Sequence, residues 1–485
     1  MLREHRRFFL WAALAGLALR MFFFVYVSSV TDDSRVYIDL ATNWLQHGVY
    51  GQTQSGQIVA IDTRLPGYPA FLATIFWIFG VGNIRAVLIA QVLLDLVTCV
   101  VIADLARRTV SSGMTSRVAF ALAATCPFLA NYATAALTET LEIFFTAVAF
   151  DCAAAGIDAI ENTVGIARLG WAYWTAAGAA IGACILLRPD GGILLAAVGI
   201  YLGVVMLRRG GNALLARSAM SGAPAGGAPS MGVPARGSIA LAGIVIAAVA
   251  LAPLVPWTIR NFRTLHHFEP LAPRYANEPE ELTPWGFNRW VKTWMAEYVS
   301  VEDIYWNVPG ESIDAGKLPA RALDEPGRDE TLAAIADYNQ SQELTPESDA
   351  RFAALAAERI RAHPVRYYLE LPVLRVADMW LRPRTELFSA DPRWWEFNDE
   401  RRESALAVGF GVLNLIYVVA ALLAITRSRP LLRYLGLMGG FLLLRTVFLG
   451  TIENPEPRYT LECYPVLLVW AAAFVGSEWE QHGYE

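Results

Sequence analysis

Residues 8–30, FFLWAALAGLALRMFFFVYVSSV, form an apolar stretch that is long enough to cross a membrane as one helix. The hydrocarbon core of a bilayer is about 30 Å thick and a helix rises about 1.5 Å per residue, so about 20 apolar residues suffice. The stretch follows Arg3, Arg6 and Arg7 and lacks an obvious small-residue cleavage site. We therefore expect a retained span whose N-terminal end lies in the cytoplasm.

Similar apolar stretches recur along the whole chain. Of its 485 residues, 55% are hydrophobic and 17% are charged, unlike the mixture in a soluble domain. Nine further spans are predicted at residues 84–106, 117–136, 139–157, 171–188, 190–207, 238–258, 403–426, 431–449 and 459–476. Most flanking arginines then fall on the cytoplasmic side, as the positive-inside rule requires. The sequence predicts an all-α polytopic membrane protein with about ten transmembrane helices and both termini in the cytoplasm.

One apolar segment is too short for a standard span. Residues 67–80 read GYPAFLATIFWIFG, a length more typical of an interfacial or re-entrant segment. Counting it as a span would put Arg107 and Arg108 outside the cell, against the positive-inside rule. We expect it to lie in the outer interface.

The predicted spans divide the chain into three parts. Residues 1–258 form a transmembrane bundle, 259–402 an outer-face domain with amphipathic helices, and 403–485 the C-terminal transmembrane helices. The first part contains an outer loop, 31–83, and a cytoplasmic linker, 208–237, whose Gly, Pro and Ser content cannot bury a core. Because functional residues concentrate in loops held by a rigid scaffold, we seek the site in the two long outer segments.

Two outer stretches have the periodicity of helices lying on a membrane surface. Residues 34–48, SRVYIDLATNWLQHG, place apolar side chains on one face and polar ones on the other, with Gly48 suited to end the helix. Its N-terminal cap is expected to be one of Asp32, Asp33 and Ser34. A second such helix is predicted over 345–362, where Phe352, Leu355 and Ala356 share the apolar stripe.

Several classes of function have no support in the sequence. The net charge is −6 and no basic tract is interleaved with aromatics, so a nucleic-acid partner is not expected. The five cysteines lie in or beside apolar segments and are expected to pack as small hydrophobes. His266, His267 and Glu269 lack the spacing of a ligand set, and no metal site is predicted.

Four aspartates stand out by their position along the chain. Asp32 and Asp33 leave the first span where it meets water, so one carboxylate can serve as a general base, although capping and solvation are the simpler reading. Asp95 and Asp151 fall within predicted spans, where neither has a recognisable basic partner in the sequence. We expect interhelical hydrogen bonds from these two residues.

Six segments of the chain form an ordered set of motifs: DDSRVYIDLATNWLQHGVYG from residue 32, RLPGYPAFLA from 64, LTETLEIFF from 137, LLRPDGG from 186, PWTIRNF from 256 and EPRYTLECYPVLL from 456. In this order they resemble the polyprenyl-phosphate-dependent GT-C glycosyltransferases, above all glycosyltransferase family 39, the protein O-mannosyltransferase type, and the aminoarabinose transferases of lipid A. The resemblance thus covers most of the chain, least so about 265–345. It implies a GT-C-type helical bundle with juxtamembrane helices on the outer face.

The resemblance also implies roles for individual acids. In that family an acid four residues before an aromatic in the first outer loop is assigned as the catalytic acid/base, which matches Asp33 before Tyr37 better than Asp32. A second acid corresponds to Glu139, although Glu142 lies on nearly the same helix face and leaves that assignment open. The supporting residues implied here are Asp32, Tyr37, Tyr68 and Tyr459.

Four arginines at predicted outer edges depart from the positive-inside rule. Arg64, Arg188, Arg260 and Arg458 are candidates for binding the donor phosphate, and Arg64 and Arg458 are preferred because their motifs match the family. The alternative is that each arginine snorkels to lipid headgroups.

Taken together, the sequence predicts a glycosyltransferase of the plasma (inner) membrane that acts on its outer face. The donor would be a polyprenyl-phosphate-linked sugar, transferred with inversion to a lipid, glycan or protein acceptor; no other cofactor is expected, and membrane lipids are its surroundings. The alternatives are a multi-span transporter or lipid flippase and a noncatalytic assembly subunit. Transporters tend to show repeated halves and interrupted helices, and no convincing half-to-half similarity is found here. The sugar, the acceptor and the oligomeric state are left open.

Overall fold

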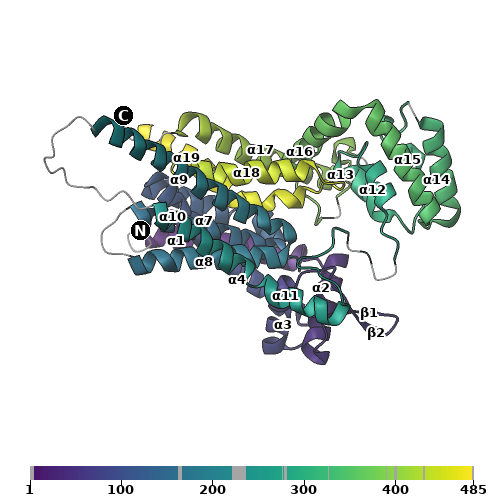
Figure 1. Cartoon of the computed structure of the whole chain (residues 1–485), viewed down its shortest axis with the longest axis horizontal. Coiled ribbons are helices and arrows are strands. Elements are labelled where there is room, and N and C mark those ends of the chain that lie inside the picture. Colours follow the sequence, from purple (N-terminus) through teal and green to yellow (C-terminus); the bar gives the residue numbers. More distant parts are fainter. Residues whose placement is uncertain are drawn as a thin grey trace. The chain divides into compact units, whose positions relative to one another are not determined.

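The computed structural model describes residues 5–161, 167–220, 236–275, 277, 281–325, 327–388, 390–397, 401–429 and 432–482. These residues are mostly helical, with one antiparallel hairpin of β1 (Gly51–Gln54) and β2 (Gln57–Ala60), in which Gly51 pairs with Ala60 (Figure 1). The chain forms two compact units. The first comprises residues 1–274, 417–442 and 462–485, and the second comprises 275–416 and 443–461.

Eight candidate spans in the described part of the chain are long and apolar enough to cross a membrane. They lie in α1 (Arg6–Tyr26), α4 (Ile84–Val110), α7 (Glu139–Glu161), α8 (Ala167–Leu187), α9 (Gly192–Met220), the pair α10 (Arg236–Leu251) and α11 (Leu254–Leu265), α17 (Arg401–Arg427) and α19 (Tyr464–His482). Two shorter apolar helices are α3 (Gly67–Phe79) and α18 (Leu435–Gly450). The predicted fold class, an all-α polytopic membrane protein, is confirmed.

Two expectations about the transmembrane region are wrong in detail. The single helix expected over 117–136 is divided into α5 (Gly113–Ala124) and α6 (Pro127–Tyr132), because Pro127 has no N–H to continue α5. The expected linker over 208–237 begins as helix, since α9 continues to Met220. Residues 221–235 of that linker lie outside the described residues.

Both intramembrane aspartates form the interhelical hydrogen bonds that were expected, but their partners are arginines that the sequence did not indicate. Asp95 of α4 forms an ion pair with Arg20 of α1, with Nη2 and Oδ2 2.5 Å apart and both side chains buried. Arg20 also donates to the carbonyl oxygen of Ala124, at the end of α5 (2.7 Å). Asp151 of α7 lies 2.8 Å from the Nε of Arg108. These partners were missed because they are 75 and 43 residues away along the chain.

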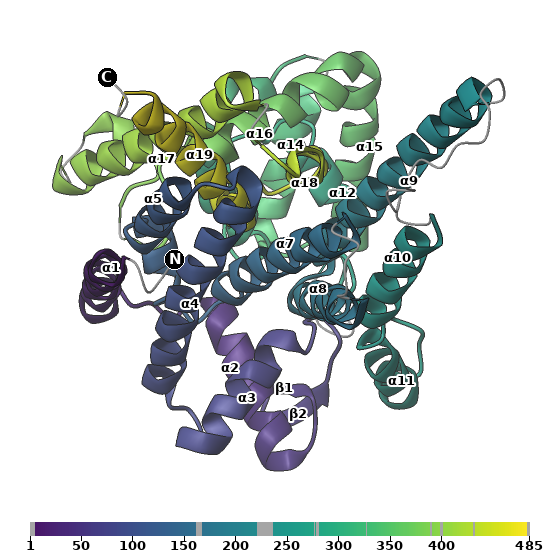
Figure 2. The same ribbon diagram turned by 90° about the vertical axis from the view of Figure 1, so that its left-hand side faces the viewer.

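One end of the first unit is built from α2 (Asp32–His47), α3 and the hairpin, which lie side by side in Figures 1 and 2. The N-cap of α2 is Thr31, which forms a reciprocal capping box with Ser34, so the expected cap at residues 32–34 is wrong by one position. Gly48 ends the helix with φ +69°, as predicted.

Part of the apolar face of α2 lies against protein. Ala41 is fully buried with Tyr68 and Leu72 of α3, while Leu40 is buried beside Tyr50 and against other side chains of the same end. Trp44, on the same face, is 38% exposed, so the apolar stripe correctly predicted a face that is largely removed from water.

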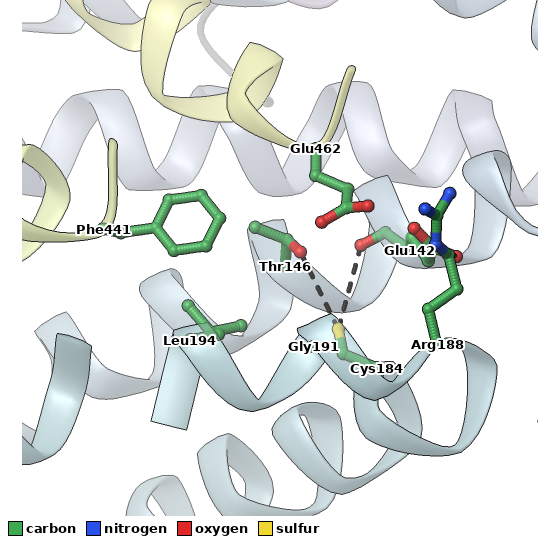
Figure 3. A pocket seen from close by; sticks show the side chains of 8 residues that line it. All are labelled: Glu142, Thr146, Cys184, Arg188, Gly191, Leu194, Phe441 and Glu462. Atoms are coloured by element: carbon green, nitrogen blue, oxygen red, sulfur yellow. Dashed lines mark hydrogen bonds and ion pairs between the residues drawn. The ribbon is translucent and has the colours of Figure 1, made fainter. Parts of the chain in front are cut away.

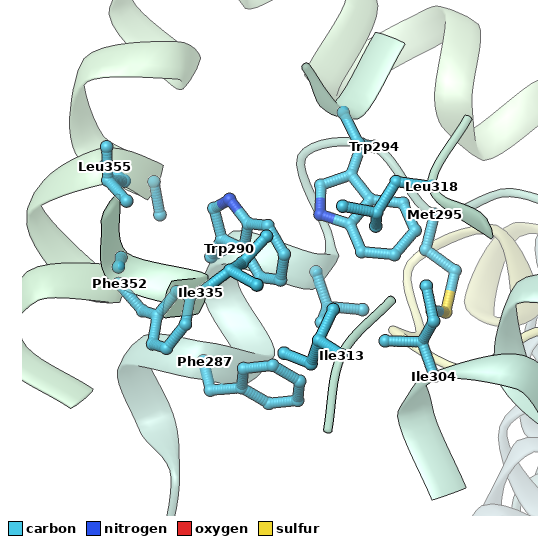
Figure 4. Close-up of a cluster of buried hydrophobic side chains, with 14 of the residues drawn as sticks. Phe287, Trp290, Trp294, Met295, Ile304, Ile313, Leu318, Ile335, Phe352 and Leu355 are labelled. Atoms are coloured by element: carbon cyan, nitrogen blue, oxygen red, sulfur yellow. The ribbon is translucent and has the colours of Figure 1, made fainter. Parts of the chain in front are cut away.

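The second unit has its own helical core. It contains α12 (Trp285–Val291), α13 (Tyr298–Asp303), α14 (Arg328–Ser341), α15 (Pro346–Ala362) and α16 (Leu371–Leu381). Phe352, Leu355 and Ala356 of α15 lie in this core with Trp290 and Phe287 (Figure 4), so the expected surface helix over 345–362 is a core helix.

Short helical turns complete the described structure. They are the 3-10 turns η1 (Pro189–Gly191), η2 (Tyr305–Asn307), η3 (Ala315–Lys317), η4 (Ala320–Ala322), η6 (Trp394–Glu396) and η8 (Pro457–Cys463), and the π-helical turn η5 (Arg366–Glu370). Of these, η1 and η8 carry predicted site residues or flank them.

Candidate catalytic site

Asp33 and Arg64 meet at the end of the first unit. Asp33 lies in the first turn of α2, where the helix dipole favours a carboxylate. Arg64 lies between the hairpin and α3, and its Nη2 donates to Asp33 Oδ1 at 3.1 Å. The two side chains remain 25% (Arg64) and 34% (Asp33) exposed, so the pair is open to reactants. The neighbouring Asp32 is 98% exposed and pairs instead with Arg35 at 3.0 Å.

Tyr37 lies near several of the predicted site residues of the first unit. It is one turn after Asp33, and its ring contacts that of Tyr68 edge to face with centroids 5.1 Å apart. Burial raises the pKa of Tyr37 to about 12, and four charged side chains lie close enough to change that pKa further. They are, in decreasing order of effect, Arg64, Asp33, Arg188 and Glu139. The structure thus brings together acids and arginines from four separate segments.

Glu139 and Glu142 face different surroundings although they are one turn apart on α7. Glu139 is 2% exposed, and its charge acts on Tyr37. Glu142 lies 3.8 Å from Arg188 Nε, which is also 3.4 Å from Asp190. Of the two acids, Glu139 is therefore the one associated with the Asp33 end.

A small cavity surrounds Glu142 in the first unit (Figure 3). Its volume is about 10 Å³, room for about one water molecule. It is lined by Glu142, Thr146, Cys184, Arg188, Gly191, Leu194, Phe441 and Glu462. This volume is too small for a sugar or a phosphate, so the cavity as it stands is not a substrate pocket.

In the first unit, the side chain of Arg260 donates hydrogen bonds to backbone carbonyl oxygens. Its Nη1 donates to the carbonyl oxygen of Ile61 at 2.7 Å, and its Nη2 donates to that of Tyr50. The guanidinium also lies 5.2 Å from the ring centroids of both Tyr50 and Trp257. Tyr50 in turn donates its hydroxyl to the carbonyl oxygen of Arg64 at 2.8 Å. Arg260 therefore holds the segment that carries Arg64.

Arg458 and Tyr459 belong to the second unit, in the turn η8. Arg458 Nε lies 2.6 Å from Glu456 Oε2, and the Tyr459 hydroxyl donates to Glu456 Oε1 at 2.5 Å. Two buried arginines, Arg384 and Arg445, donate to backbone carbonyls of the same turn at 2.6 and 3.1 Å. The turn that carries Arg458 is thus held in place through hydrogen bonds to its backbone.

The histidines that were considered as metal ligands either contact another side chain or lie apart from other possible ligands in the described residues. His267 Nε2 lies 2.6 Å from Asp62 Oδ2. Across the described ranges, no three His, Cys, Asp or Glu side chains form a group that could hold a metal ion.

Sequence reasoning missed three polar residues near the site. Asp190 and Glu462 lie within the quoted motifs but were not singled out, and Gln91 lies in the first third of the apolar α4. A polar side chain within a predicted span was the available signal for Gln91.

Comparisons with known proteins agree with this fold. Residues 63–217 match the family described as dolichyl-phosphate-mannose-protein mannosyltransferase. No curated protein sequence matches significantly.

Among solved structures, the archaeal oligosaccharyltransferase AglB from Archaeoglobus fulgidus, in complex with an inhibitory peptide and a dolichol-phosphate, is 12% identical with a TM-score of 0.53; the alignment covers 100% of this chain and 52% of that one. The same enzyme tethered to an acceptor peptide gives 13% identity and a TM-score of 0.52, with coverages of 99% and 50%. ArnT from Cupriavidus metallidurans bound to undecaprenyl phosphate is 14% identical over 96% of this chain and 77% of that one, with a TM-score of 0.36.

The fold and the family match define the class: this is a multi-pass membrane protein with a GT-C-type fold. The resemblance to polyprenyl-phosphate-dependent GT-C enzymes, inferred from six motifs, is confirmed by the mannosyltransferase family match over residues 63–217. The chain spans about half the length of the archaeal oligosaccharyltransferase that it matches.

Proposed function

We propose that this protein is a glycosyltransferase that moves a sugar from a polyprenyl-phosphate donor to an acceptor hydroxyl on the outer face of the plasma membrane. The observation that carries the proposal is the partly exposed pair of Asp33 and Arg64, whose Oδ1 and Nη2 atoms lie 3.1 Å apart one turn before Tyr37. A transfer to a hydroxyl needs a base for the acceptor proton and positive charge for the leaving phosphate. Both kinds of group are present at this end of the first unit.

The donor class is chosen by fold and by charge. The archaeal oligosaccharyltransferase of the same fold was solved with a dolichol-phosphate. Arg64 and Arg188 lie at ends of apolar helices, and the sequence predicts that these ends are on the outer face. The guanidinium group of arginine binds phosphate oxygens well. Membrane-embedded helices beside the site would receive the lipid tail.

In the proposed step, Asp33 accepts the proton of the acceptor hydroxyl while the acceptor oxygen forms a bond to the anomeric carbon. The bond between that carbon and the phosphate oxygen breaks, and its electron pair leaves with the phosphate. One displacement of this kind inverts the anomeric configuration. Arg64, 3.1 Å from Asp33, is placed to face the charge of the departing phosphate.

The remaining predicted residues take secondary roles. Glu139 supports the site from the start of α7, and Tyr37 and Tyr68 fill the space between the charged groups. Arg260 acts through the backbone that carries Arg64, while Arg458 and Tyr459 are retained as a second phosphate-binding candidate. The segment at about 265–345, which the resemblance covers least, is proposed to select the acceptor.

The test is the loss of sugar from a radiolabelled polyprenyl-phosphate donor in membranes that contain the protein and native acceptors. General base catalysis contributes about 10²–10⁴-fold, so Asp33→Asn should lower the rate by that factor while the protein remains folded in the membrane. Asp32→Asn is the matched control. It makes the same charge change at the adjacent exposed carboxylate, which pairs with Arg35 and not with Arg64, and should lower the rate far less than Asp33→Asn does.

Two results would overturn the proposal. One is full activity in a well-folded Asp33→Asn protein. The other is translocation of the lipid-linked sugar without cleavage of its bond to phosphate, which would support a flippase instead.

A further inference from the structure

A chain of contacts crosses three helices of the first unit, starting beside Asp33. Tyr37 of α2 contacts the ring of Tyr68 of α3. The Tyr68 hydroxyl donates to Gln91 Oε1 of α4 at 2.7 Å. Gln91 Nε2 then donates to the carbonyl oxygen of Ala135 at 2.7 Å. One amide side chain therefore joins α3 to the loop that precedes α7.

That loop, residues 133–138, carries Glu139 at its end. Its other side is tied to the chain entering α2, because Ser29 and Ala135 form a parallel β-bridge. Gln91 Nε2 is also 3.5 Å from the carbonyl oxygen of Ala133. The loop before the second candidate acid is thus held between Gln91 and the segment that leads to Asp33.

The amide of Gln91 is unexpected at this position, because the side chain is fully buried in an apolar helix. A buried amide is costly unless its donor and acceptor are both satisfied. Here the acceptor end takes the tyrosine hydroxyl and the donor end reaches a backbone carbonyl. A leucine or methionine would fill the space but could make neither bond.

We propose that Gln91 is a positioning residue that sets the location of Glu139 relative to Asp33 during glycosyl transfer. This inference rests on the proposed function. Gln91 does not touch reacting atoms and acts through the loop, so its loss should reduce kcat more than donor affinity. A displacement of about 1 Å at a catalytic group can lower a rate by about 10²-fold.

The test compares three variants of the full-length protein with the donor assay above. Gln91→Met keeps the length of the side chain but makes neither bond, and should lower kcat by about 10- to 100-fold while the KM for the donor changes by less than about threefold. Gln91→Glu, when its carboxyl is protonated, has one donor and one acceptor and should restore most of kcat.

The matched control is Thr98→Val, two turns further along the same face of α4. Thr98 is buried and its hydroxyl donates only within its own helix, to the carbonyl oxygen of Leu94 at 3.0 Å. This variant should keep both kcat and KM. Yield and thermal unfolding of all variants are measured beside the kinetics to separate loss of fold from loss of rate.

Each outcome decides one of the two proposals. Wild-type kcat in Gln91→Met, equal impairment of Gln91→Glu and Gln91→Met, or equal impairment of Thr98→Val, contradicts the positioning role alone. A folded wild-type protein that never cleaves the donor contradicts the proposed function and this inference with it.

Discussion

Replacing Asp95 with leucine should destabilise the first unit more than replacing its partner Arg20. The two side chains are 2% and 0% exposed, and the closest atoms of the pair are 2.5 Å apart. Leucine at position 95 leaves a buried guanidinium without its carboxylate, and arginine does not lose its proton in proteins. Breaking a buried pair from one side typically costs about 3–5 kcal/mol of the free energy of unfolding.

The reverse change is expected to cost less. In Arg20→Met the remaining carboxyl can take up a proton and become neutral. The main loss is then the hydrogen bond to the carbonyl oxygen of Ala124 at the end of α5, worth about 1–3 kcal/mol when the acceptor stays buried. The double variant Arg20→Met/Asp95→Leu removes both charges, so it should be more stable than Asp95→Leu alone.

The assay is unfolding of the purified protein by denaturant in one detergent, with Leu93→Ala as the control. Leu93 is 57% exposed on the same helix and should have little effect. The reasoning is refuted if Asp95→Leu is no more destabilising than Arg20→Met, or if the double variant loses the sum of the two single losses.

Three further predictions concern other parts of the chain. Burial raises the pKa of Glu386 to about 7, so the folded state holds a proton that the unfolded chain releases above about pH 4.5. Glu386→Gln should therefore stabilise the protein at pH 8, because glutamine has no charge to bury. Thermal unfolding should show that this gain in stability fades as the pH falls from 7 towards 4.5. A Cβ on Gly286 would lie 1.9 Å from a backbone oxygen of α15, so Gly286→Ala should destabilise the second unit by about 1–3 kcal/mol, whereas Gly409→Ala, with no atom within 4 Å, should not; limited proteolysis distinguishes them. Arg260→Met has no donor for the carbonyl oxygens of Ile61 and Tyr50 and should speed hydrogen–deuterium exchange across residues 50–64; unchanged exchange would contradict the role of Arg260 in holding this segment.

The transmembrane character was readable from the sequence because it depends on local properties. A backbone in lipid must satisfy its hydrogen bonds within the segment, so length and hydropathy suffice to predict most spans. Gly48 was likewise predictable, since a glycine after an amphipathic helix suits the left-handed conformation that ends it. The division of 117–136 at Pro127 had a local signal as well, in the missing N–H of proline.

The sequence did not predict what packs against the apolar face of each amphipathic helix. A periodic apolar stripe indicates that one face is removed from water, but lipid and protein are both apolar. Only the fold shows that α3 covers α2 and that α12 and α14 cover α15.

Length, hydropathy and motifs sufficed to predict that the chain spans a membrane, that it resembles lipid-phosphate-dependent transferases, and which acids and arginines were candidate site residues. The pairing of side chains came only from the fold: Asp33 meets Arg64 at 3.1 Å, and Asp95 meets Arg20, 75 residues away and not a candidate before. Charge pairing acts through space over a few ångströms, whereas sequence patterns report neighbours along one helix or strand. Periodicity and composition therefore do not predict contacts between distant segments of the chain.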